Sequence, residues 1–108
     1  MKVTVNKIEI VRFEYRQERG DKDLGTCLWA FFDVDAPKGT ITIQGDRGHY
    51  AHTWPERDGD FWKLCVTMDG SYMMHKMTGK ARVTDSKLEQ IWDECIQPEV
   101  VKYLGGDA

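Results

Sequence analysis

The stretch from Gly39 to Gly79 changes its hydrophobic period partway along, and this change constrains the fold more than any other feature of the chain. Its first part alternates Ile41 and Ile43 with threonines, which is the period of a half-buried strand. Its later part spaces apolar residues by three and four, which is the period of one helix face. The residues with this second spacing are Phe61, Leu64, Cys65 and Met68. A strand period followed by a helix period predicts an α+β fold in which a sheet precedes helices.

Four segments have the composition of strands and are separated by turn residues: residues 2–16, 26–35, 40–44 and 49–54. Proline and glycine in residues 36–39 predict a hairpin turn, because proline fixes φ and glycine accepts a positive φ. We therefore expect a four-stranded antiparallel meander. In the first segment the alternation slips between Val5 and Ile8 and again after Ile10, which favours a bulge or a strand covered on both faces.

Two short helices are expected after the sheet. The first begins at Phe61, and Asp58 or Asp60 is expected to cap it, since a carboxylate can accept hydrogen bonds from the first amides of a helix. The second runs from Tyr72 to Met77, with Ser71 as its expected cap.

The third helix has the clearest pattern. Ser86 and Glu89 have the spacing of a capping box, and Pro98 is expected to break or kink the helix, with residues 99–104 as a last turn. Its apolar stripe comprises Leu88, Ile91, Trp92, Cys95 and Ile96. We expect all three helices to pack on one face of the sheet.

The length and composition predict one domain spanning residues 1–108. No apolar run approaches the roughly 18 residues of a membrane span, and the N-terminus lacks an apolar signal-peptide core, so a cytoplasmic location is expected. Three cysteines, Cys27, Cys65 and Cys95, fit thiols in a reducing compartment better than a disulfide framework.

The charge is distributed unevenly. The net charge of −3 argues against binding driven by neutralisation of nucleic-acid phosphates. Residues 83–108 contain two basic and six acidic residues, a local charge of −4. An acidic helix can face a basic surface of a protein partner, which makes Glu89, Asp93 and Glu94 candidate binding residues. The alternative is an ordinary solvated helix face.

No motif for catalysis or phosphate binding is present. The chain has no Walker loop, dinucleotide fingerprint, nucleophile elbow or HExxH helix. Cys65 and Cys95 fall in apolar helix stripes, where a thiol stays neutral, and Cys27 has no cationic neighbour in sequence. The sequence predicts a protein that is not an enzyme and has no catalytic residues.

Zinc is the one candidate cofactor. His49 and His52 are three residues apart, so on a strand they would point to opposite faces. If the hairpin is in register, Cys27 lies beside His49 with Asp46 close by, which makes Cys27 and His49 candidate ligands. Zinc would need two more ligands from the helices. The alternative is buried cysteines that act as small apolar residues and histidines on the surface.

The fourth strand gathers aromatic side chains. Tyr50, His52 and Trp54 alternate and share one face, and Arg47 lies in the preceding turn. Aromatic side chains on a sheet can stack on single-stranded nucleic acid, so Arg47, Tyr50 and Trp54 are candidate binding residues. Alternatively this face supports the helices as part of the core.

The segment Gly45 to Trp54 (GDRGHYAHTW), followed by DFWKL and SYMMHKM, resembles a pattern in small proteins of phages and prophages of Firmicutes. In that pattern an aromatic strand precedes a Phe-rich helix and a Tyr-Leu-Leu-x-Lys-Leu helix. The chain departs from it at Arg47, His49 and His52. The matching residues are Asp46, Gly48, Tyr50, Trp54, Phe61, Leu64, Tyr72 and Lys76.

This resemblance implies a mobile-element origin, and such genomes encode anti-CRISPR proteins and other stoichiometric inhibitors of host defence. The resulting hypothesis is a non-enzymatic accessory protein that binds and inhibits a bacterial nuclease complex such as a CRISPR nuclease. It predicts a protein partner, no direct contact with nucleic acid or membrane, and a monomer or small homo-oligomer. The alternatives are a small zinc-binding structural module and a sheet-based binder of single-stranded nucleic acid.

Overall fold

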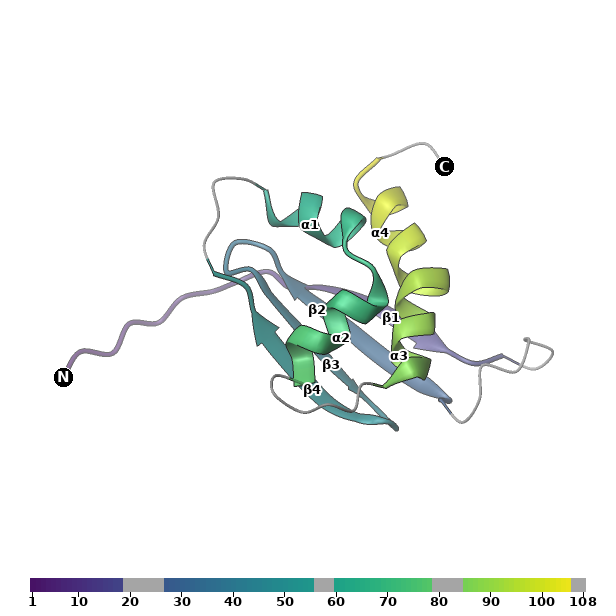
Figure 1. Ribbon diagram of the computed structural model, residues 1–108. Coiled ribbons are helices and arrows are strands. Elements are labelled where there is room, and N and C mark those ends of the chain that lie inside the picture. Colours follow the sequence, from purple (N-terminus) through teal and green to yellow (C-terminus); the bar gives the residue numbers. More distant parts are fainter. Residues whose placement is uncertain (19–26, 56–59, 79–84, 106–108) are drawn as a thin grey trace.

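The computed structural model describes residues 1–18, 27–55, 60–78 and 85–105. Its sheet consists of β1 (Val11–Arg16), β2 (Trp29–Asp35), β3 (Thr40–Gly45) and β4 (Gly48–Thr53), antiparallel and in the order β1-β2-β3-β4. The helical part consists of α1 (Phe61–Thr67), α2 (Gly70–Thr78) and a continuous unit of α3 (Ser86–Ile91), the π-helical segment η1 (Trp92–Ile96) and α4 (Gln97–Tyr103). All of them cover the same face of the sheet (Figure 1). The predicted α+β fold, with a meander and then three helical units, is confirmed.

The alternation of the strands sets the register of the sheet. Phe13 lies opposite Phe32, and Phe32 lies opposite Ile43 on the next strand, so all three side chains point toward the helices. Gly39 and Gly48 close the two hairpins with φ of 72° and 117°, values that residues with a Cβ rarely adopt. The hairpin turns that proline and glycine predict are therefore present.

The first strand is shorter than the sequence predicts. Residues 1–10 form no helix or strand and are all exposed, and pairing begins at Val11 opposite Val34. The reason is the length of the partner: β2 ends at Asp35, which lies opposite Ile10 in this register, and the chain turns there, so no strand remains opposite residues 2–9. Both slips in the alternation precede Val11, where pairing begins. They therefore lie outside the sheet and do not produce the predicted bulge in β1.

Aspartates cap all three helical units. Asp60 accepts a hydrogen bond from the Trp62 amide at 2.9 Å, as predicted, whereas Asp58 lies outside the described residues. Asp69 accepts from the Tyr72 amide at 2.8 Å, so Ser71 is not the cap of α2. Asp85 accepts from the amides of Lys87 and Leu88, so Ser86 is not the cap of α3 and the predicted capping box is wrong. In both cases an aspartate, two residues before Ser71 and one before Ser86, supplies a charged and therefore stronger acceptor.

Pro98 does not break the third helix. The Gln97 amide donates to the carbonyl of Trp92, five residues earlier, and this wider turn continues directly into α4. A proline inside a regular helix lacks a donor and its ring collides with the carbonyl four residues earlier. The π-helical turn just before Pro98 relaxes that constraint, so the helix runs on to Tyr103.

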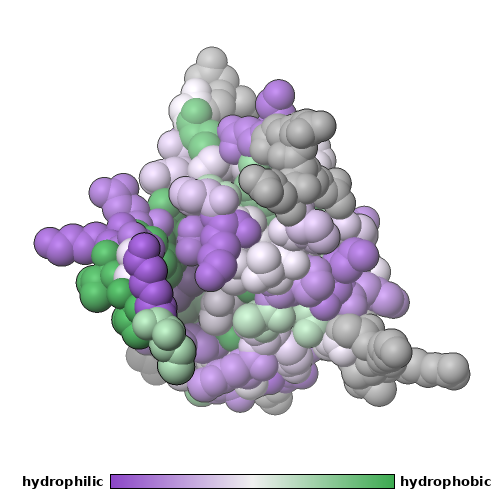
Figure 2. Space-filling view, turned by 90° about the vertical axis from the view of Figure 1, so that its left-hand side faces the viewer, coloured by the Kyte–Doolittle hydropathy of each residue, from purple (hydrophilic) through white to green (hydrophobic). Residues whose placement is uncertain are grey.

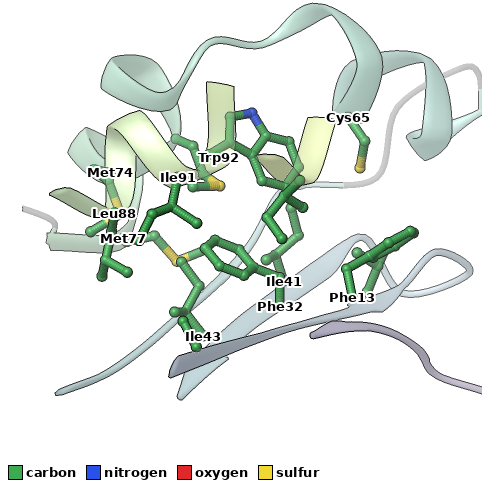
Figure 3. Close-up of a cluster of buried hydrophobic side chains, with 14 of the residues drawn as sticks. Phe13, Phe32, Ile41, Ile43, Cys65, Met74, Met77, Leu88, Ile91 and Trp92 are labelled. Atoms are coloured by element: carbon green, nitrogen blue, oxygen red, sulfur yellow. The ribbon is translucent and has the colours of Figure 1, made fainter. Parts of the chain in front are cut away.

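The core is a single apolar layer between the sheet and the helices (Figure 3). Trp92 packs over Phe32 with ring centroids 6.0 Å apart, and its indole N–H donates to the carbonyl of Met68 at 3.0 Å. Side chains with no more than 1% exposure surround this pair: Ile41, Ile43, Met74, Leu88 and Ile91. Among the described residues, no helix has the length and apolar character to cross a bilayer.

Gly70 allows α2 and α3 to approach closely. Its amide donates to the Asp93 carboxylate at 2.7 Å, and a Cβ on Gly70 would stand 2.7 Å from the Cα of Glu89. A backbone neighbour cannot move aside as a flexible side chain can. The contact between the two helices therefore requires glycine at this position.

We expect Gly70→Ala to lower the free energy of unfolding by about 1–3 kcal/mol, the usual cost of overpacking a tight contact. Urea denaturation measures the change. Ser71→Ala is the matched control, because Ser71 is exposed on the same helix and should change stability by less than about 0.5 kcal/mol. Equal stability of Gly70→Ala and the native chain would contradict the close packing of α2 on α3.

Candidate functional site

The predicted aromatic face of β4 lies under the helices. Tyr50 is opposite Ile43 and His52 is opposite Ile41, so both share the helix-covered side of the sheet. Trp54 is only 2% exposed and packs against His52 at 4.7 Å between ring centroids. Burial and the charge of nearby Lys76 lower the pKa of His52. These side chains belong to the core and its margin, which is the second of the two interpretations given for this face.

Arg47 is tied to a helix. It lies in the turn between β3 and β4, and its Nε donates to both carboxylate oxygens of Asp85 at 2.8 and 2.9 Å. The same carboxylate caps α3, so this half-buried ion pair fixes the end of the sheet to the start of the C-terminal helix. The hydrogen bond with Asp85 raises the pKa of Arg47. Arg47 therefore holds the turn between β3 and β4 against the start of α3, in addition to any role in binding a partner.

Cys27 and His49 have different surroundings. Cys27 is fully buried in the core cluster, whereas His49 is exposed and lies opposite Gln44 in the register of the sheet. Asp46 is near Cys27, as predicted, and its carboxylate accepts a hydrogen bond from the Leu28 amide at 2.8 Å. Within residues 1–18, 27–55, 60–78 and 85–105, no three or more His, Cys, Asp or Glu side chains gather into a group able to hold a metal ion. Zinc binding through Cys27 and His49 stays a prediction.

The predicted acidic residues of the third helix differ in availability. Asp93 holds the Gly70 amide, and Glu89 is half-buried beside Gly70. Glu94 is exposed and accepts a hydrogen bond from Gln90 one turn earlier at 3.0 Å. Glu99, farther along, is also exposed and lies 3.4 Å from Lys102. The part of the acidic helix that points to solvent is thus centred on Glu94 and Glu99.

The outer face of the sheet is a surface that the sequence analysis missed. Trp29 and Phe31 of β2 pack edge to face at 5.0 Å on the side without helices. The guanidinium of Arg12 lies 4.7 Å from the centre of the Phe31 ring, and that of Arg16 lies 5.2 Å from it. Arg12 also forms a two-bond ion pair with Asp33, at 2.7 and 2.9 Å. The nearly unbroken apolar run of β2 was the available signal, because it implies apolar side chains on both faces of that strand.

The N-terminal residues form a second surface that was missed. Val3, Val5, Ile8 and Ile10 are between 50% and 90% exposed. Residues 1–10, here called the arm, extend away from the body of the domain (Figure 1).

Comparison with known proteins identifies no relative: no protein-family model, no curated protein and no solved structure matches the chain.

The buried thiols are poorly ionised. Burial, with the Asp46 charge as the next cause, raises the pKa of Cys27 to about 11, and burial raises the pKa of Cys65 to about 12. Cys95 is only half-buried. Because the thiolate is the reactive form, Cys27 and Cys65 should be inert at neutral pH.

We expect Ellman's reagent at pH 8 to modify only Cys95 in the native protein and all three thiols after denaturation. The native rates of Cys27 and Cys65 should rise only as the pH approaches their raised pKa values, about 11 for Cys27 and about 12 for Cys65. Cys95→Ser should remove the native reaction. Rapid modification of Cys27 at pH 8 would show that its thiol is accessible and ionised, contrary to this environment.

Proposed function

We propose that this chain is a non-enzymatic protein that inhibits a bacterial defence nuclease complex, such as a CRISPR nuclease, by binding its surface. The observation that carries the proposal is the exposed acidic side of the C-terminal helix. A stoichiometric inhibitor needs a rigid scaffold and a complementary surface, and it needs no catalytic residues.

The acidic side chains stand on a well-anchored helix. The opposite, apolar side of the helix is buried, and Gln97 donates to the carbonyls of Cys65 and Met68 at 2.9 and 2.7 Å. The buried stripe comprises Leu88, Ile91, Trp92, Ile96 and Val100. The backbone that carries Glu94 and Glu99 is thereby held in a fixed position at the surface. Fixed charges bind at a lower entropic cost than charges on a flexible segment.

Charge complementarity indicates the class of partner. Nuclease complexes bind nucleic acid in positively charged channels, and an exposed acidic helix can occupy such a channel in place of phosphates. The resemblance to phage and prophage proteins supports the same class, because those genomes encode inhibitors of bacterial defence. The high thiol pKa values of Cys27 and Cys65 favour binding over cysteine-based catalysis.

We expect purified, guide-loaded CRISPR nucleases of several types to include one that retains the protein at near-equimolar ratio and loses DNA cleavage. Glu94→Lys with Glu99→Lys should weaken that binding about tenfold or more, because both charges then repel a basic surface. Glu18→Lys is the control for charge reversal, since Glu18 is an exposed acid far along the chain from the helix. Retention by none of the nucleases, or equal binding of the double variant, would contradict the proposal.

The outer sheet face supports a second candidate, a binder of single-stranded nucleic acid. Trp29 and Phe31 offer aromatic rings and Arg16 offers a cation, which together resemble the stacking surfaces of sheet-based binders. Arg12 is already paired with Asp33, however, and the net charge is −3. We therefore rank this candidate below the protein-binding one.

We expect fluorescence anisotropy to show no binding of labelled single-stranded DNA or RNA at about 0.15 M salt. Salt-sensitive binding that Arg16→Glu abolishes would reverse the ranking, because it would locate the contact on the outer sheet face. Lys63→Glu, an exposed cation on α1, is the control with the same charge change.

A further inference from the structure

The arm has the sequence of a strand but no partner within its own domain. Its residues, KVTVNKIEI from position 2, are rich in β-branched side chains, and no described residue pairs with them. The side of the molecule toward which the arm points shows green apolar side chains next to purple hydrophilic ones (Figure 2). An exposed, extended, apolar segment of this kind is a template for pairing with another strand.

The edge of the sheet next to the arm is also unpaired. β1 pairs with β2 on one side only, and no described residue pairs with its other side. A groove of about 360 Å³ runs along this edge, between β1 and the side chains of Cys95, Ile96 and Glu99. Tyr103, whose ring packs on Phe13 at 5.9 Å, is 55% exposed beside it. The edge thus combines unpaired backbone with an apolar flank.

We propose that two copies of this chain associate by antiparallel pairing of the arm of each with β1 of the other, with Ile8 on the two-fold axis. In this register the numbers of two facing residues add up to 16. The arm of one copy then covers the β1 edge of its partner, and the two four-stranded sheets join into one. The inference goes beyond the proposed inhibitory function and concerns the β1 edge, which adjoins the acidic surface at Glu99.

The apolar side chains of the arm match in this register except for Ile10, which faces Asn6. Val3 faces Phe13 and Val5 faces Val11 of the other copy, and facing residues of an antiparallel pair lie on the same side of a sheet. Phe13 is buried on the helix side, so the two valines would extend the core beneath the exposed Tyr103. Ile8 faces its own counterpart on the opposite side of the sheet. Because the alternation slips between Val5 and Ile8, Val3 and Val5 lie on the helix side of the joined sheet and Ile8 lies on its outer side.

The charges match as well. Lys2 faces Glu14, and Lys7 faces Glu9, so the symmetry of the dimer forms each opposite-charge pair twice. A sum of 14 would place Lys2 opposite Arg12, and a sum of 18 would place it opposite Arg16. Odd sums of 15 or 17 would place Val3 opposite Arg12 or Glu14. Among these neighbouring registers, only the sum of 16 places both Val3 and Val5 opposite apolar residues and also pairs opposite charges, which favours a second copy as the partner.

Sedimentation velocity of the full chain over a wide range of concentration tests the proposal. We expect a reversible dimer that Ile8→Glu abolishes, because two carboxylates would then meet on the axis. Lys7→Glu alone and Glu9→Lys alone should each weaken dimerisation about tenfold, since each creates two like-charge contacts. Combining Lys7→Glu with Glu9→Lys restores both opposite-charge pairs and should restore the affinity. Lys38→Glu, an exposed turn residue, is the control.

Three results would overturn the proposal. One is a chain that stays monomeric at every concentration, which would leave the arm to another protein. Another is a dimer that survives Ile8→Glu, which would locate the interface elsewhere. The last is a combined Lys7→Glu and Glu9→Lys variant that is no tighter than the single variants, which would exclude this register. Because Ile8 is 63% exposed in the isolated domain, circular dichroism should show an unchanged fold in all variants.

Discussion

The contact between Trp92 and Phe32 is the interaction on which the rest of the structure depends. It joins the C-terminal helix to the middle of the sheet, and the indole N–H ties the same side chain to the end of α1 through the carbonyl of Met68. The π-helical turn that begins at Trp92 lets the helix pass Pro98 and continue over the sheet. The helices cover one face of the sheet. Three surfaces remain accessible to other molecules: the outer sheet face, the acidic side of the helix and the arm.

Much of this layer could be predicted from the sequence, because an element that is buried on one side has apolar residues at a regular spacing. Ile41 and Ile43 indicated a strand, and Leu88, Ile91 and Trp92 indicated the stripe of the third helix, as observed. Which side of a strand the helices cover is a tertiary property, so the position of the half-buried Trp29 and Phe31 on the outer face of the sheet could not be read from their spacing. The caps of α2 and α3 were displaced because an aspartate stands one or two residues before each serine and either side chain can accept the first helical amides. The length of the first strand depended on its partner rather than on its own composition.

A dimer would change how the acidic helix works. Two-fold pairing through the arm presents two copies of the surface around Glu94 and Glu99 on one rigid body, so one dimer could engage two sites or two nuclease complexes. It would also remove the unpaired β1 edge, which otherwise exposes the sheet to non-specific strand pairing. Glu99 flanks the β1 edge as well as belonging to the acidic surface, but the residues that pair in the dimer are those of the arm and β1, so Ile8→Glu tests the dimer without removing the acidic surface.

Amide hydrogen exchange, followed residue by residue by NMR, tests most directly the claim that the core leaves the arm outside and that a second copy covers it. The account predicts slow exchange of the central amides of β2, β3 and η1 at every protein concentration, because these segments enclose the core. It predicts slow exchange of amides in residues 2–10 at high concentration and fast exchange on dilution. Arm amides that exchange at the rate of an unfolded chain at all concentrations would contradict the account.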